Sequence, residues 1–245
     1  MSTFFAYSDE GYYSLTQAGV VFFIAIAAVL ILLVSFLKHT LTVDTEGADA
    51  GKPDNAESAE SGKSFFSTKQ LIFSAVSLAI AFALSYVKLL HMPWGGSVTL
   101  CSMLFVAFIG YMYGPKIGLT CGLAYGILQF IQGGSGYILS PMQVGFDYIL
   151  AFMALGLSGI TSGKKNGLLT GYIIAIVARG IFHSIGGYIY WMDYMPDDFP
   201  ASLAAVYPIC YNFAYILLEG VITVVIISLP PVKKALNQVK RMALS

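Results

Sequence analysis

The sequence predicts an all-α membrane protein: a six-helix transmembrane bundle preceded by one extra transmembrane helix. Of its 245 residues, 57% are hydrophobic and 11% are charged, and the mean hydropathy is +0.76. Apolar runs long enough to cross a bilayer, about 20 residues each, recur along the chain, whereas a barrel would show short alternating strands. The predicted spans are 17–37, 68–90, 97–113, 117–133, 143–161, 167–191 and 204–229.

The first predicted span is separated from the others by a polar segment. The leader before it contains acidic residues but no Lys or Arg, and its apolar run is too long for a signal peptide. Residues 42–64 hold six acidic residues, two lysines and few apolar residues. We therefore expect four regions: an N-terminal helix (1–39), a flexible acidic cytoplasmic linker (40–67), a six-helix membrane domain (68–230) and a basic cytoplasmic tail (231–245).

Basic residues predict the orientation in the cell membrane, because Lys and Arg mark the cytoplasmic ends of spans. Except for Lys88, the basic residues near the ends of the predicted spans fall on one predicted side of the membrane. They are Lys38, Lys63, Lys69, Lys116, Lys164, Lys165, Lys233, Lys234, Lys240 and Arg241. The opposite loops are neutral or acidic, as in 192–200. This distribution predicts a multi-pass protein with its N-terminus outside and its C-terminus in the cytoplasm.

Three charged side chains lie well within the predicted bundle: Asp147, Arg179 and Glu219. Such charges are costly in hydrocarbon and should face the interior with a partner or a ligand. Arg179 and Glu219 lie at similar depths on consecutive helices, about 18 Å and 15 Å from the cytoplasmic ends, which predicts a structural ion pair. Asp147 lies nearer the external side with no basic residue expected beside it. It is therefore protonated, hydrated at the surface, or free for a cationic ligand.

Polar and aromatic residues accompany Asp147 at the external level. Arg179, His183, Gly187 and Trp191 are spaced four residues apart and share one helix face. The other members of this predicted aromatic cage are Tyr137, Tyr148, Tyr207 and Asn212. Aromatic faces around a carboxylate favour an organic cation. Each of these residues also has a purely structural interpretation. The aromatic residues fit an interfacial belt, the histidine fits a buried residue that is hydrogen-bonded, and the glycines fit close helix packing.

A stripe of small residues and the absence of an ATP-binding motif both indicate whether the protein works with other subunits. Ala75, Ala79 and Ala83 form a stripe that lets another helix approach, either within the bundle or from another subunit. The "SGKS" at 61–64 lacks the first glycine of a P-loop and lies in the linker. No metal-ligand cluster, cofactor motif or catalytic motif is present in the sequence. We therefore expect no enzyme and no cofactor, and any ATP hydrolysis is expected in partner chains.

Several stretches in order resemble one family, the thiamine-specific substrate-binding subunits (S-components) of energy-coupling-factor (ECF) vitamin transporters. They are "GGSVTLCSM" (95–103), "GLTCGLAYGILQFIQG" (118–133), "GYILSPMQVGFDYILA" (136–151), "FHSIGGYIYW" (182–191) and "AAVYPICYN" (204–212). The resemblance covers about 68–230 and implies a six-helix bundle with an outward-facing site. It does not extend to the N-terminal helix or its linker.

The resemblance also implies ligand contacts and partners. The expected thiamine contacts are Tyr137, Asp147, Tyr148, His183, Gly187, Trp191, Tyr207 and Asn212, with Trp94 and Thr99 as further candidates. The family usually has a glutamate where this chain has Asp147. The stripe at Ala75, Ala79 and Ala83 resembles the surface that docks on a transmembrane coupling subunit driven by two ATPase subunits. The expected function is high-affinity thiamine capture outside the cell for ATP-driven uptake.

Three alternatives remain at the level of sequence. A stand-alone secondary transporter of a small organic cation would use the intramembrane charges to couple transport to protons or ions. A membrane enzyme would use His183 and Asp147 as acid and base. An S-component for another vitamin would keep the fold and change the ligand.

Overall fold

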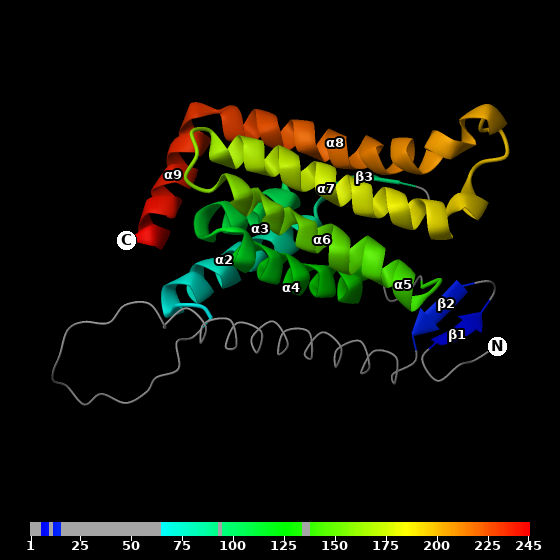
Figure 1. Ribbon diagram of the computed structural model, residues 1–245, viewed down its shortest axis with the longest axis horizontal. Helices are drawn as coiled ribbons and strands as arrows, with labels where there is room; N and C mark the ends of the chain where they lie inside the picture. Colours follow the sequence, from blue (N-terminus) through cyan, green and yellow to red (C-terminus); the bar gives the residue numbers. More distant parts are fainter. Residues whose placement is uncertain (1–5, 10–11, 16–64, 93–94, 134–137) are drawn as a thin grey trace, which may run out of the picture.

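The computed structural model describes residues 6–9, 12–15, 65–92, 95–133 and 138–245, and in these ranges it is mostly helical (Figure 1). The helices of the body are α2 (Thr68–Ser85), α3 (Ser102–Tyr113), α4 (Pro115–Gly133), α7 (Gly167–Tyr190) and α8 (Tyr207–Ser228). A sixth, composite segment joins α5 (Pro141–Val144), η2 (Gly145–Leu150), α6 (Ala151–Met153) and η3 (Ala154–Thr161). These segments confirm the predicted all-α bundle. The first predicted span, 17–37, and linker residues 40–64 lie outside the described residues.

Four described segments are long and apolar enough to cross a membrane: Thr68–Ser85, Pro141–Thr161, Gly167–Tyr190 and Ala201–Ser228. The last includes η5 (Ala201–Val206), which leads into α8, and η4 (Met192–Tyr194) follows α7. The apolar α3 is shorter, with 12 residues. Each of the six predicted spans from 68 onward therefore contains a helix, and the chain is a membrane protein.

A β-hairpin occupies a stretch that the sequence assigns to two spans. The helix α2 ends at Ser85, and β3 (Lys88–His91) pairs antiparallel with β4 (Ser97–Thr99). The connection turns through Gly95 and Gly96, whose φ angles are 94° and 81°, values that glycine adopts readily. A short apolar run does not by itself distinguish a strand from a helix, so the predicted boundaries at 90 and 97 are wrong. A second hairpin joins β1 (Ala6–Asp9) to β2 (Tyr12–Leu15).

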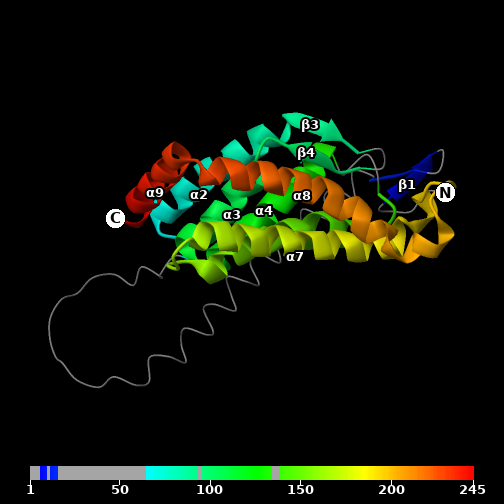
Figure 2. The ribbon, with the colours of Figure 1, turned by 90° about the horizontal axis from the view of Figure 1, so that it is seen from above.

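Small residues let the helices of the bundle pack closely. The backbones of η3 and α4 approach so closely that a side chain on Gly156 would collide with the backbone of Gly118. Large side chains fill the remaining core, among them the fully buried Tyr125 and Tyr172. Figure 2 shows the β3–β4 hairpin beside α8, where β4 packs against that helix.

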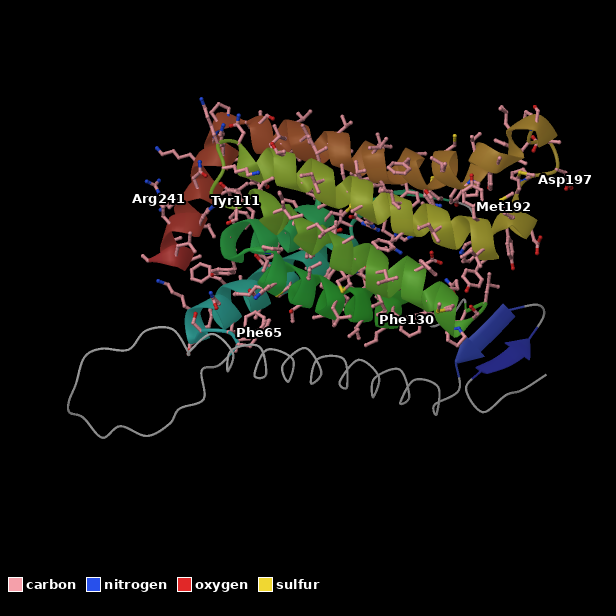
Figure 3. The ribbon with its side chains drawn as sticks, in the orientation of Figure 1. Phe65, Tyr111, Phe130, Met192, Asp197 and Arg241 are labelled. Atoms are coloured by element: carbon pink, nitrogen blue, oxygen red, sulfur yellow. The ribbon has the colours of Figure 1, made fainter. Side chains whose placement is uncertain are left out.

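The predicted basic tail forms a further helix, α9 (Pro230–Leu244), across one end of the bundle (Figure 1). Its apolar side, with Leu236, Val239 and the buried Ala243, packs against the core and contacts α2, α3 and α8. Figure 3 shows Arg241 at this end and Asp197 at the opposite end. The predicted basic tail and the predicted external loop 192–200 therefore lie at opposite ends of the described molecule, which are called the basic end and the acidic end below.

Candidate functional site

A cavity of about 680 Å³ lies between α7, α8, the β3–β4 hairpin and the composite segment. Every predicted ligand residue that the structure describes lines this cavity: Thr99, Asp147, Tyr148, His183, Gly187, Trp191, Tyr207 and Asn212. The predicted residues Trp94 and Tyr137 lie outside the described residues. The structure therefore brings together side chains from segments more than 100 residues apart in sequence.

Two helix faces with the same spacing form much of the cavity wall. Arg179, His183 and Gly187 follow one another on α7, with Trp191 capping its C-terminal end, and Tyr207, Tyr211, Tyr215 and Glu219 do so on α8. Each series spans about 18 Å along its helix. Tyr211 and Tyr215 are not among the predicted residues. The four-residue spacing that identifies the α7 face would also have identified them.

Asp147 is held by uncharged hydrogen-bond donors. Gln143 Nε2 donates to Asp147 Oδ2 at 2.7 Å, and Trp191 Nε1 donates to the same oxygen at 3.0 Å. His183 Nδ1 lies 3.6 Å from the other oxygen, Oδ1. The side chains of Asp147 and His183 are only 12% and 11% exposed. Gln143 was not predicted, although its position one turn before Asp147 is the signal that could have indicated it.

The backbone around Asp147 departs from a regular α-helix. Residues Gly145–Leu150 form a π-helix, a distortion that often occurs at functional sites. On α7, a Cβ atom added to Gly186 would lie 2.7 Å from Asp147 Oδ1. Because glycine leaves this space open, the carboxylate can approach α7, where His183 and Trp191 meet it.

The predicted ion pair between Arg179 and Glu219 is wrong. Among the described residues, the only contact of ion-pair length joins His183 to Asp147. Both Arg179 and Glu219 instead line the cavity, with their side chains directed to other partners. Similar depth does not determine which way each side chain points around its helix axis, so depth alone could not predict the pairing.

Glu219 binds the β4–α3 junction. Its Oε2 accepts hydrogen bonds from the backbone N–H and the hydroxyl of Thr99, both at 2.7 Å. Its Oε1 accepts from the backbone N–H of Met103 at 3.3 Å and from the Ser102 hydroxyl at 3.5 Å. Cys101, the residue before α3, makes no side-chain cap, so the carboxylate takes its place at a helix end that favours negative charge. Glu219 thus holds the hairpin wall of the cavity against α8.

We expect Glu219→Gln to destabilise the protein. Both oxygens of the Glu219 carboxylate accept hydrogen bonds, whereas the Gln amide has one oxygen and one NH₂ group. The NH₂ group cannot accept, so one backbone N–H at the β4–α3 junction loses its acceptor. The expected loss is about 1.5 to 3 kcal/mol, the range for a hydrogen bond to a charged group. A lowered midpoint of thermal unfolding in detergent would show it. The exposed loop residue Asp198, changed to Asn, makes the same acid-to-amide change away from the spans and serves as the control, and equal midpoints for both variants would contradict the capping role.

Aromatic rings continue the cavity wall towards the acidic end. The rings of Trp191 and Tyr194 lie 5.3 Å apart, and those of Tyr207 and Tyr211 lie 5.8 Å apart. Deeper inside, the His183 ring lies 6.1 Å from that of Tyr215. This arrangement provides apolar faces with polar edges, which suit a flat, charged heteroaromatic ligand.

Asn212 links α8 to α7 beside the cavity. Its amide nitrogen donates to the carbonyls of His183, at 3.2 Å, and Pro208, at 2.8 Å. Its carbonyl oxygen accepts from the Tyr215 hydroxyl at 3.1 Å. Because both N–H groups are engaged, Asn212 can offer a ligand only the second lone pair of its oxygen. A Cβ on Gly187 would lie 2.8 Å from Pro208, so this glycine also allows the helices to meet.

The predicted stripe on α2 faces outward. Ala75, Ala79 and Ala83 are exposed, and so are the apolar residues beside them, Leu71, Ile72, Val76 and Ile80. The opposite face of α2 carries its buried residues, Ser74, Ser77, Ala81 and Ser85. Within the described part of the chain, the stripe is therefore not an internal packing surface of the bundle.

Comparison with known proteins identifies the family. The sequence profile of the thiamine transporter proteins (Thia_YuaJ) matches residues 71–238. The thiamine transporter ThiT of Bacillus subtilis is 31% identical over 175 residues, which cover 65% of this chain and 88% of that protein. ThiT of Lacticaseibacillus paracasei is 28% identical over 178 residues, covering 65% and 86%.

A solved structure agrees with this relationship. The structure of ThiT from Listeria monocytogenes matches with a TM-score of 0.53 and 26% identity, and the match covers 66% of this chain and 94% of that one. The match begins within α2 and ends within α9, and it includes every residue that lines the cavity. The chain therefore belongs to the thiamine transporter family.

Proposed function

We propose that this protein binds thiamine in the cavity and is the substrate-binding S-component of an ECF transporter. The observation that carries the proposal is the Asp147 carboxylate, oriented by Gln143 and Trp191 inside an aromatic cavity. Thiamine joins an aminopyrimidine to a positively charged thiazolium ring. A carboxylate with uncharged hydrogen-bond donors keeps its negative charge for such a ligand, and aromatic rings add cation–π attraction.

The roles of the cavity residues follow from their chemistry. Asp147 faces the cationic or amine-bearing part of thiamine, and Trp191, Tyr148 and Tyr137 stack on its rings. His183 and Asn212 contact polar edges, Tyr207 completes the wall, and Thr99 and Trp94 are the proposed cover of the ligand. Gly187 leaves room beside Asn212. In place of the longer glutamate common in the family, Asp147 reaches the ligand because Gly186 permits its approach to α7.

Transport requires partners that supply the energy. The exposed stripe at Ala75, Ala79 and Ala83 is the proposed docking surface for a transmembrane coupling subunit, and two ATPase subunits hydrolyse ATP. The basic end with α9 faces the cytoplasm and the acidic end with Asp197 faces outward. The cavity then receives thiamine from outside and releases it inward when the coupling module reorients the protein.

Thiamine should quench the tryptophan fluorescence of the purified protein. The chain has two tryptophans, and Trp191 lines the cavity, so a bound heteroaromatic cation alters its emission. Titration in detergent should saturate below micromolar thiamine. An excess of an unrelated vitamin that does not absorb in this range, such as biotin, should leave the thiamine titration unchanged. No saturable quenching at micromolar thiamine would refute the proposed ligand.

A further inference from the structure

Arg179 contacts His183 rather than a carboxylate. Its Nε–H donates to His183 Nε2 at 3.3 Å, and its guanidinium carbon lies 4.3 Å from the centre of the Phe152 ring. The residue is 8% exposed, and within the described part of the chain no acid lies at ion-pair distance from it. Glu219, the nearest candidate by depth, is engaged by the β4–α3 junction.

This contact determines which nitrogen of His183 carries the proton. A guanidinium has donors and no acceptor, so the imidazole nitrogen that it contacts must accept. With Nε2 as the acceptor, this contact fits the neutral ring with its proton on Nδ1 and does not fit the imidazolium form. That nitrogen is the one that faces Asp147 Oδ1 at 3.6 Å.

The other described neighbours of the His183 side chain leave its two ring nitrogens to Arg179 and Asp147. The Tyr215 and Phe152 rings face it edge-on, with centroids at 6.1 Å and 6.5 Å. Asn212 contacts the backbone carbonyl of His183 and leaves the ring free. Arg179 and Asp147 are thus the charged groups that act on the imidazole in the described structure.

We propose that Arg179 is a positioning residue, which holds His183 as the neutral Nδ1–H tautomer and so keeps Asp147 charged and oriented for a cationic ligand. The tautomer itself is independent of any ligand, whereas its effect on binding depends on thiamine being the substrate. A protonated His183 would neutralise Asp147 and repel a thiazolium. The Nε2–H tautomer would direct a lone pair at the carboxylate and turn the ring away.

If Arg179 is removed, the proposal and simple charge repulsion predict opposite changes in the affinity for a cationic ligand. Removing a cation from a cavity that binds a cation should strengthen binding if Arg179 acted only through its charge. If Arg179 positions His183, its removal should weaken binding, by about tenfold for the loss of a hydrogen bond that involves a charged group. Arg179→Met keeps the length and apolar stem of the side chain and removes the donor.

The first test is long-range ¹H–¹⁵N correlation NMR of the full-length protein labelled with ¹⁵N-histidine, without ligand. The chain has three histidines, and His183→Gln identifies the signals of His183. We expect a protonated Nδ1 and an unprotonated Nε2 in the wild type. Arg179→Met should lose this pattern, and Arg179→Lys, which keeps a charged donor, should restore it. A wild-type Nε2–H or imidazolium pattern, or an unchanged pattern in Arg179→Met, would overturn the proposal.

The second test is thiamine affinity by titration calorimetry for the same variants. We expect Arg179→Met to bind about tenfold more weakly and Arg179→Lys to recover most of the loss. Equal or tighter binding by Arg179→Met would overturn the positioning role. If the wild type fails to bind thiamine, the proposed function fails, while the NMR result on His183 still decides the tautomer.

Discussion

Asp147→Asn should weaken thiamine binding by at least about tenfold, which corresponds to about 1.4 kcal/mol. The substitution removes the negative charge that we assign to the cationic ligand, so a charge-assisted contact becomes a neutral one. It also disturbs the free site. If the new amide oxygen accepts from Gln143 and Trp191, the amide nitrogen lies towards the Nδ1–H of His183, and two donors face each other.

Calorimetric titration of the purified variant would measure this effect. Asp198→Asn is the matched control, because it makes the same change at an exposed residue that does not line the cavity, and it should bind like the wild type. Asp147→Glu keeps the charge and should lose less affinity than Asp147→Asn. Wild-type affinity in Asp147→Asn would exclude the carboxylate from the site.

Hydropathy predicted the helices well because the bilayer imposes a minimum apolar length on each span. All six predicted segments from residue 68 onward contain a helix. The same criterion failed at 88–90 and 97–99, where residues of the two predicted spans form strands: Leu89 and Leu90 lie on the exposed strand β3, and Val98 is buried on β4. Pro93, Gly95 and Gly96 agree with the predicted loop between these spans, but nothing in the hydropathy shows that the strands begin before the loop and continue after it.

Four-residue spacing predicted one face of the site. The same spacing was not applied to the next helix, so two of its cavity residues were missed. The α7 face from Arg179 to Trp191 follows from four-residue spacing, and the structure places its members on one cavity. The same spacing runs through Tyr211 and Tyr215 on α8. The pairing of Glu219 was mispredicted because the free N–H groups of a neighbouring helix end compete for a carboxylate. That helix end becomes its neighbour only in the folded chain.

Trp191→Ala should weaken thiamine binding by about thirtyfold, since a desolvated cation–π contact contributes about 2 kcal/mol. The indole has two roles in the proposed site. Its ring covers the ligand, and its N–H donates to Asp147 Oδ2 at 3.0 Å. Trp191→Phe separates them, because it keeps an aromatic face and removes the N–H. We expect it to bind more weakly than the wild type and more tightly than Trp191→Ala.

Calorimetry is the suitable measurement, since these substitutions remove one of the two tryptophans on which fluorescence depends. Tyr188→Ala is the control, because it removes an aromatic ring from an exposed position on the same helix. If Trp191→Phe binds as weakly as Trp191→Ala, the N–H that orients Asp147 dominates. If it binds like the wild type, the ring dominates. Wild-type affinity in both variants would show that Trp191 belongs to the interfacial belt and contributes nothing to the ligand.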